Sequence, residues 1–235
     1  MSHYCHLSPL LLPLLSFATA AITRIVHYLK KMRFWNLCSG AGSVSRPFAE
    51  NGWEVIEVDI SGRHAPTHVV DLNDWDCPYE TGFFDVIWAS PDCTQYSRAR
   101  TTAKEPRNLE KADRLVKRCL ELIFHLQPRV WFLENPDSGL LKTRDFMKDI
   151  PFVRVDYCAY GADFRKRTRI WTNADWTPKL CDRSHLVGNR HHKTAQRGGE
   201  GEHGTCMINV IWTSCMHYLP NCVKTYLHIV HIRSK

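Results

Sequence analysis

The chain has 235 residues, of which 44% are hydrophobic and 23% are charged. These are ordinary values for a globular protein, and they exclude a largely disordered chain and a collagen-like fibre. The 31 lysines and arginines outnumber the 24 aspartates and glutamates, and the resulting net charge of +7 is compatible with a polyanionic partner.

Ten cysteines are spread along the chain without tight spacing, mostly within apolar segments. A small secreted protein stapled by disulfides would show a compact cysteine framework, so this usage indicates reduced thiols in an intracellular protein. The expected location is the nucleus if the source is eukaryotic, and the cytoplasm if it is prokaryotic or viral.

The two ends of the chain differ from its middle. Residues 1–31 hold an apolar run that prolines interrupt and that no lysine or arginine precedes. We predict a leader outside the fold, with a signal peptide and a membrane anchor as the alternatives, and we expect no membrane partner. Residues 32–180 form the predicted domain. Residues 181–235 form a predicted basic, histidine-rich and then apolar extension, whose segment Cys206 to Val223 either closes the domain or is foreign to it.

Strands and helices alternate through the predicted domain. A strand over residues 33–37 precedes a short helix that Ser43 can cap. Further strands are expected over residues 54–60, 68–70 and 83–89. Leu109 to Gln127 has the period of an amphipathic helix, and a last buried strand follows from Val130 to Leu133. Repeated strand–helix units predict an α/β fold with a doubly wound, mostly parallel sheet.

Ligands of such sheets bind beyond the carboxyl ends of the strands. The first strand leads into the glycine turn Ser39-Gly40-Ala41-Gly42, the second into Asp59 and the third into Asp71. Asp59 could accept hydrogen bonds from ribose hydroxyls, and Asp71 could accept from an exocyclic amine. Together they favour a nucleoside-containing cofactor, while the lack of a third glycine argues against a dinucleotide.

The next two strands lead into reactive side chains. Cys93 lies in a loop that continues into a run of arginine and lysine, and nearby positive charge favours a thiolate. Glu134 follows the last strand at a proline turn, where it could donate a proton. The alternatives are a structural cysteine in a tight turn and a carboxylate that only caps its turn.

Four motifs in order resemble the cytosine-5 DNA methyltransferase family over roughly residues 33–173. Phe34 to Gly42 resembles the family's cofactor loop, Pro91-Asp92-Cys93 its nucleophile motif, and Glu134-Asn135-Pro136 its Glu-Asn-Val motif. Tyr160-Gly161 with the segment Arg165 to Arg169 resembles its tyrosine-glycine and Arg-x-Arg segment. The resemblance implies a Rossmann-like, S-adenosylmethionine-dependent methyltransferase fold, with DNA as the partner.

The resemblance also implies a role for each site residue. Cys93 would add to C6 of a flipped cytosine, Glu134 would donate to N3, and Arg167 and Arg169 would hold the base carbonyl or a phosphate. Contacts to S-adenosylmethionine are expected from Phe34, Ser39, Gly40, Ala41, Gly42, Ser43, Asp59, Ile60, Asp71 and Pro91. Contacts to nucleic acid are expected from Ser97, Arg98, Arg100, Lys104 and Arg107.

The chain departs from the family in two places. Asp92 beside the nucleophile is unusual, and it would raise the pKa of Cys93 if it pointed inward. Little sequence follows Arg169, where typical members carry a large target-recognition region, so we expect weak sequence selectivity or a targeting partner, as in a compact viral or phage enzyme. The alternatives are the same chemistry on RNA such as tRNA, and a truncated member that binds without turnover.

A cluster in the extension has the residue types of a zinc site. Its spacing matches no usual finger, and interleaved lysines and arginines favour phosphate contacts, so no metal is expected. The cluster consists of Cys181, His185, His191, His192, His203 and Cys206.

Overall fold

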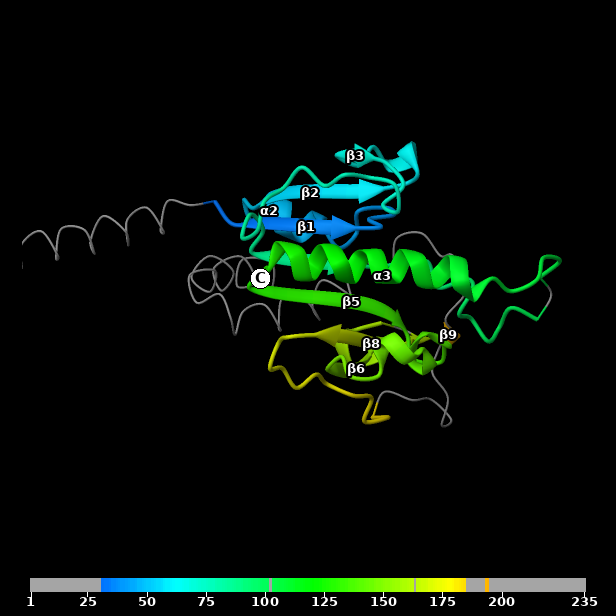
Figure 1. Ribbon diagram of the computed structural model, residues 1–235. Helices are drawn as coiled ribbons and strands as arrows, with labels where there is room; N and C mark the ends of the chain where they lie inside the picture. Colours follow the sequence, from blue (N-terminus) through cyan, green and yellow to red (C-terminus); the bar gives the residue numbers. More distant parts are fainter. Residues whose placement is uncertain (1–30, 102, 163, 185–192, 195–235) are drawn as a thin grey trace, which may run out of the picture. The chain divides into compact units, whose positions relative to one another are not determined.

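The computed structural model describes residues 31–101, 103–162, 164–184 and 193–194 (Figure 1). Residues 1–30, most of the histidine cluster and the segment Cys206 to Val223 lie outside this range, so the expectations about them stay predictions. The chain divides between Met32 and Arg33 into two units, and every element below belongs to the second. Within the described residues, no helix is long and apolar enough to cross a membrane.

A seven-stranded sheet with the order β3-β2-β1-β4-β5-β8-β6 forms the centre of the fold. Five neighbouring strands are parallel: β1 (Arg33–Leu37), β2 (Glu54–Asp59), β3 (His68–Val69), β4 (Val86–Ala89) and β5 (Val130–Pro136). β8 (Arg167–Thr172) runs antiparallel to both β5 and the edge strand β6 (Phe152–Asp156). The predicted mostly parallel, Rossmann-like sheet is therefore confirmed.

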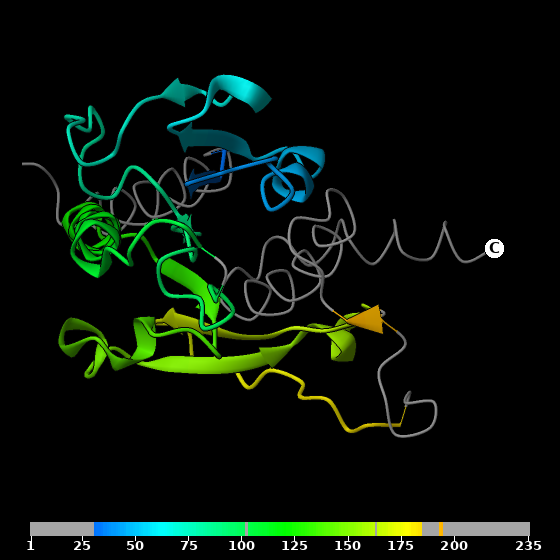
Figure 2. The same ribbon diagram turned by 90° about the vertical axis from the view of Figure 1, so that its right-hand side faces the viewer.

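Two helices cover opposite faces of this sheet (Figure 2). α2 (Arg46–Glu50) packs through Phe48, whose ring stacks on Phe34 with the centroids 3.8 Å apart. α3 (Leu109–Leu126) packs on the other face, against the cluster that contains Trp35 and Leu37, because successive side chains of β1 point to opposite sides. The sheet is doubly wound, as the alternation of elements predicts.

Short elements complete the described fold. Four 3₁₀ turns cover Gly62–His64 (η1), Leu141–Thr143 (η2), Asp145–Met147 (η3) and Tyr157–Tyr160 (η4). β7 (Phe164–Arg165) and β9 (Lys193–Thr194) pair as a separate two-stranded sheet.

Element boundaries differ from the predicted ones where tertiary contacts intervene. Ser45, not Ser43, precedes α2, and its side chain makes no capping hydrogen bond. The predicted last strand ends at Leu133, but β5 continues to Pro136 because β8 pairs with its final residues. Glu134 therefore lies within a paired strand and not in the turn after it. α3 is capped as a helix should be, since Asn108 accepts from the backbone N–H of Lys111 at 2.8 Å.

A buried carboxylate ties α3 to the loops that follow β4 and β5. Asp113 Oδ1 accepts from the Tyr96 hydroxyl at 2.8 Å, and Arg144 Nε and Nη2 donate to Oδ2 at 2.9 and 2.6 Å. Tyr96 is fully buried, and its carbonyl accepts from the N–H of Leu140 at 2.9 Å. Charge-assisted, two-pronged pairs of this kind fix geometry as well as adding stability. The loop that carries Cys93 is thereby anchored at its base.

Removing this carboxylate should destabilise the fold strongly. We expect Asp113→Ala to lower the free energy of unfolding by about 3–5 kcal/mol, because it leaves Arg144 and the Tyr96 hydroxyl without their partner. Tyr96→Phe removes a single hydrogen bond and should cost about 1–2 kcal/mol. Urea unfolding followed by circular dichroism measures both values. If Asp113→Ala cost no more than the exposed neighbour variant Arg114→Ala, the anchoring role would be refuted.

Candidate active site

A cavity of about 500 Å³ opens at the carboxyl ends of β1, β2, β3 and β4. The order of the chain through the sheet reverses between β1 and β4, and open α/β sheets bind ligands at such a point. The volume falls within the range of small-molecule pockets, about 300–1,000 Å³. Of the predicted cofactor residues, Gly40, Asp59, Ile60 and Asp71 line it. The strand ends thus converge as the parallel sheet predicts.

Two carboxylates at the cavity differ in what they already bind. Asp59 accepts from the N–H groups of Gly40 and Ser61, each at 2.8 Å, so it fastens the glycine turn to the end of β2. Asp71 accepts from the Asn73 backbone N–H at 2.9 Å and from its side-chain amide at 2.8 Å, both through Oδ1. These bonds lower the pKa of Asp71. Its Oδ2 has no partner among the described residues, so it is available to a ligand's amine.

Gly42 suits the glycine turn by its backbone conformation and its lack of a Cβ. Gly42 has a φ of +65°, and a Cβ there would lie 2.8 Å from Oε1 of Glu57. Ala41 is exposed, and the buried Ser39 hydroxyl lacks a partner within the described chain. Ser39, Ala41, Gly42 and Ser43 therefore shape the turn, and none of them lines the cavity.

Two further residues that were predicted to contact the cofactor, Phe34 and Pro91, do not line the cavity. Phe34 is fully buried against α2 on the opposite face of the sheet, so its expected contact with a cofactor is wrong. Cys38, at the end of β1, lines the cavity instead. Pro91 is buried without lining the cavity, and its carbonyl accepts from the Asn135 side-chain amide at 3.1 Å, which ties the Cys93 loop to β5.

Strand ends do not supply the whole lining of the cavity. Lys111, Ala112 and Leu115 reach it from the first turns of α3, and Leu72 reaches it from the loop after β3. The three α3 residues do not follow a strand, so the pattern of strand ends in the sequence does not indicate them. Lys111 interacts with one of the predicted residues, because its charge helps to lower the pKa of Asp71.

Cys93 lies in the loop after β4, Glu134 lies within the neighbouring strand β5, and the two side chains interact electrostatically. The Cys93 side chain is half-buried, and burial raises the pKa of its thiol. The charges of Glu134 and Asp92 raise this pKa further, while the charge of Lys166 lowers it. Cys93 is therefore mostly a neutral thiol near pH 7.

Glu134 is held by two side chains from other elements. Only 8% of the residue is exposed. Its Oε1 accepts from the Tyr157 hydroxyl at 3.5 Å and lies 3.5 Å from Lys166 Nζ. Burial raises the pKa of Tyr157, so the hydroxyl keeps its proton, and Glu134 raises the pKa of Lys166, so the amine stays charged.

Arg167 and Arg169 do not join Glu134, contrary to expectation. The antiparallel register sets Glu134 opposite Ile170 and Asn135 opposite Arg169. Opposed residues share one face of a sheet and side chains alternate along a strand, so both arginines point to the face away from Glu134. Because of this alternation, the structure does not bring them together with Cys93.

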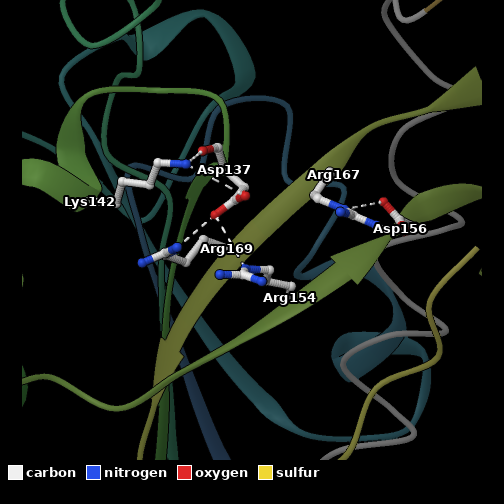
Figure 3. A network of polar contacts seen from close by, with 6 residues as sticks. All are labelled: Asp137, Lys142, Arg154, Asp156, Arg167 and Arg169. Atoms are coloured by element: carbon white, nitrogen blue, oxygen red, sulfur yellow. Dashed lines mark hydrogen bonds and ion pairs between the residues drawn. The ribbon is translucent and has the colours of Figure 1, made fainter.

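Both arginines are engaged in ion pairs on that other face (Figure 3). Arg167 donates to the fully buried Asp156 at 2.9 and 2.7 Å. Arg169 Nε donates to Asp137 at 2.8 Å, and its guanidinium lies 3.7 Å from the centroid of the Phe152 ring. These contacts give the two arginines a structural role.

Two arginines of the basic segment after Cys93 form hydrogen bonds with backbone carbonyls of the same segment. Arg107 donates to the carbonyls of Gln95 and Ser97, and Arg100 donates to the carbonyl of Glu105 at 2.8 Å. Arg98 and Lys104 are exposed and form no ion pair or hydrogen bond with the described residues. Of the five residues expected to contact nucleic acid, these two have free cationic groups, while Arg100 and Arg107 shape the loop.

In the described part of the chain, no group of three histidine, cysteine or acidic residues stands close enough to hold a metal ion. Cys181 alone of the predicted zinc ligands falls there, and its N–H donates to Asp156 at 3.1 Å. Cys181 lies beside Cys158, and burial together with this neighbouring thiol raises the pKa of Cys158 to about 12.

Comparisons with known proteins add the following findings. No family model matches the chain. The "Probable DNA (cytosine-5)-methyltransferase" of Frog virus 3 (isolate Goorha) is 35% identical over 202 residues, which cover 74% of this chain and 91% of that protein. The crystal structure of the S. pombe Dnmt2 methyltransferase is similar at 12% identity and a TM-score of 0.41, over 63% of this chain and 52% of that chain. The magnesium protoporphyrin IX methyltransferase from Synechocystis PCC 6803, with bound SAM, is 16% identical with a TM-score of 0.39, over 66% and 75% of the two chains.

The charge of Asp92 should be measurable at Cys93. Asp92 Oδ1 accepts from Thr94 N at 2.9 Å and from Thr94 Oγ1 at 2.6 Å, and an asparagine oxygen can keep both bonds. Asp92→Asn therefore removes only charge, so the pKa of Cys93 should fall. We expect alkylation of Cys93 by iodoacetamide at pH 8 to become about two- to threefold faster, since one pKa unit is tenfold in thiolate. Peptide mass spectrometry measures this rate, and an unchanged or slower reaction would contradict the prediction.

Proposed function

The chain belongs to the cytosine-5 DNA methyltransferase family, and from that premise we propose that it methylates C5 of cytosine in DNA through a covalent adduct of Cys93. Membership rests on the 35% identity that spans 91% of the viral relative. The observation that supports the mechanism is the electrostatic interaction of Cys93, in the loop after β4, with Glu134 in β5, together with the cavity that Asp92 of the same loop lines. Neither the pair of Cys93 and Glu134 nor the cavity would support this chemistry alone.

The cavity residues fit S-adenosylmethionine by their chemistry. Asp59 offers carboxylate oxygens that suit ribose hydroxyls, and Oδ2 of Asp71 suits the exocyclic amine of adenine. Ile60, which is 70% exposed at the cavity, supplies an apolar surface for a base. When bound, this cofactor supplies an electrophilic methyl group on a sulfonium sulfur.

Cys93 supplies the activation that cytosine needs. C5 of cytosine is a poor nucleophile until a thiolate adds to C6 and makes an enamine. The thiol proton must leave first, and Glu134 is the carboxylate whose charge most strongly raises the pKa of Cys93. In this proposal, Glu134 takes this proton and delivers one to N3 as charge develops on the ring. Loss of the C5 proton to a base and release of the thiolate then restore Cys93.

DNA is favoured as the substrate because the relative is named for it. A flipped base of RNA could enter the same site, so tRNA is the second candidate. The exposed Arg98 and Lys104 support phosphate contacts with either polymer. We also propose that a partner supplies sequence selectivity. The proposed location is intracellular.

The reaction is tested by methyl transfer from labelled S-adenosylmethionine to DNA and, separately, to tRNA. We expect label at C5 of cytosine in DNA, and we expect Cys93→Ser to lower the rate at least about 10³-fold because no adduct can form. Unchanged circular dichroism shows that the variant is folded. Label in tRNA alone would replace the substrate, and label that persists with Cys93→Ser would overturn the mechanism.

Cofactor binding is tested at Asp71. Asp71→Asn can keep the turn with Asn73 through its carbonyl oxygen. It replaces the free Oδ2 acceptor by an NH₂ group, which cannot accept a hydrogen bond from the amine of the cofactor. We expect the Kd for S-adenosylmethionine to rise about tenfold, the cost of one lost charge-assisted hydrogen bond. Titration calorimetry without nucleic acid gives this value. Asp76→Asn, in the same loop, is the matched control, and equal Kd values for the two variants would refute the role.

A further inference from the structure

We propose that Lys166 is the residue that holds Glu134 in place and supplies the positive charge beside Cys93, so that it positions the reacting pair. This inference rests on the proposed function of Cys93 and Glu134. It differs from the expected arrangement, in which Arg167 and Arg169 were the cations of the site.

The backbone of Lys166 is fixed where η4 and β8 meet. Its carbonyl accepts from the N–H of Tyr157 at 3.3 Å. It precedes β8 by one residue, and alternation along the strand places it on the face of Thr168 and Ile170, the face that Glu134 shares. The lysine therefore reaches Glu134 directly, whereas Arg167 and Arg169 do not.

The side chain of Lys166 lies between the other groups of the site. Its Nζ is 3.5 Å from Glu134 Oε1 and 5.0 Å from the centroid of the Tyr157 ring. The side chain is 30% exposed, so its charge is only partly screened by water. Tyr157 donates to the same oxygen of Glu134, and the two contacts together define where the carboxylate lies.

The charges around Cys93 explain why a cation is needed. Glu134 on β5 and Asp92 in the Cys93 loop are negative, and Tyr157 on η4 is a neutral donor. Lys166 is a cation whose charge lowers the pKa of Cys93 against these two carboxylates. A thiolate that forms while Glu134 takes up its proton still faces the negative charge of Asp92, and Lys166 offsets that repulsion at the moment of attack.

Lys166 acts through its charge and does not transfer a proton. Glu134 and Tyr157 both favour its charged form, so the amine keeps its proton throughout the pH range of the reaction. The proton that reaches N3 comes from Glu134 and not from Lys166. Lys166 is accordingly a positioning residue, and its effect should follow charge more than side-chain shape.

The first test reads Cys93 directly and needs no substrate. Lys166→Met keeps an unbranched side chain and removes the charge, while Lys166→Arg keeps the charge. We expect Lys166→Met to slow alkylation of Cys93 by iodoacetamide at pH 8 about five- to tenfold, and Lys166→Arg to stay within about twofold of the wild type. Peptide mass spectrometry measures Cys93, and the half-buried Cys77 in the same samples is the internal reference.

A matched control separates this effect from a general loss of positive charge. Lys142 is 29% exposed in its side chain and lies 3.7 Å from Asp137, so it resembles Lys166 in exposure and pairing. It belongs to the network of Figure 3 and lies outside the reacting pair. We expect Lys142→Met to leave the alkylation rate of Cys93 unchanged. Equal slowing by the two variants would overturn the proposal.

The second test follows methyl transfer against pH. We expect Lys166→Met to lower kcat at least about tenfold with little change in KM for DNA, and to shift the alkaline rise of the rate to higher pH, because the pKa of Cys93 increases. Lys166→Arg should restore most of the rate. Lys166→Gln, which can still donate to Glu134, must show the same loss, and it replaces the methionine variant if that variant does not fold.

The outcomes separate this inference from the proposed function. If Lys166→Met and Lys166→Gln react and turn over like the wild type while Cys93→Ser is inactive, the role of Lys166 is refuted and the methyltransferase activity stands. If the wild type transfers no methyl group to DNA or tRNA, the proposed function fails, and the alkylation rates alone decide whether Lys166 acts on Cys93.

Discussion

The buried carboxylate of Asp113 is the interaction on which the geometry of the site depends. It joins α3 to Tyr96 in the loop after β4 and to Arg144 in the segment after β5. The first segment carries Cys93, and the second follows the strand that contains Glu134. A buried charge is stable only with its partners, so α3 and both loops must assemble together. The helix that lines part of the cavity therefore also anchors the loop that carries Cys93.

A second constraint comes from β8, which runs antiparallel to β5. Thr168 and Ile170 of β8, with Lys166 just before it, lie on the face of Glu134, whereas Arg167 and Arg169 pair with Asp156 and Asp137 on the other face (Figure 3). A slip of one residue would exchange the two sets of side chains. Ion pairs form on both faces of the sheet here, so the register is stabilised from both sides. This division of adjacent cations decides which of them can act on Cys93.

Much of the fold could be predicted from particular segments of the sequence. The continuous apolar run at β4 and the period of α3 indicated a buried parallel strand and its covering helix. The glycine turn after β1 indicated a ligand site, and Gly40 of this turn lines the cavity. Asp113 was missed although it lies at a helical spacing that places it among the apolar residues of α3. A charged residue on an apolar face signals a buried partner, but the sequence does not say which one.

The sequence by itself determined the elements, the residues at the strand ends and the family, because periodicity and short motifs are local properties of the chain. Tertiary structure alone decided that Phe34 lies away from the cofactor cavity and that α3 lines it. It also decided that Lys166, and not Arg167 or Arg169, faces Glu134. These outcomes depend on the register between β5 and β8 and on which face of the sheet each helix covers, and both are set by pairing between segments far apart in the chain.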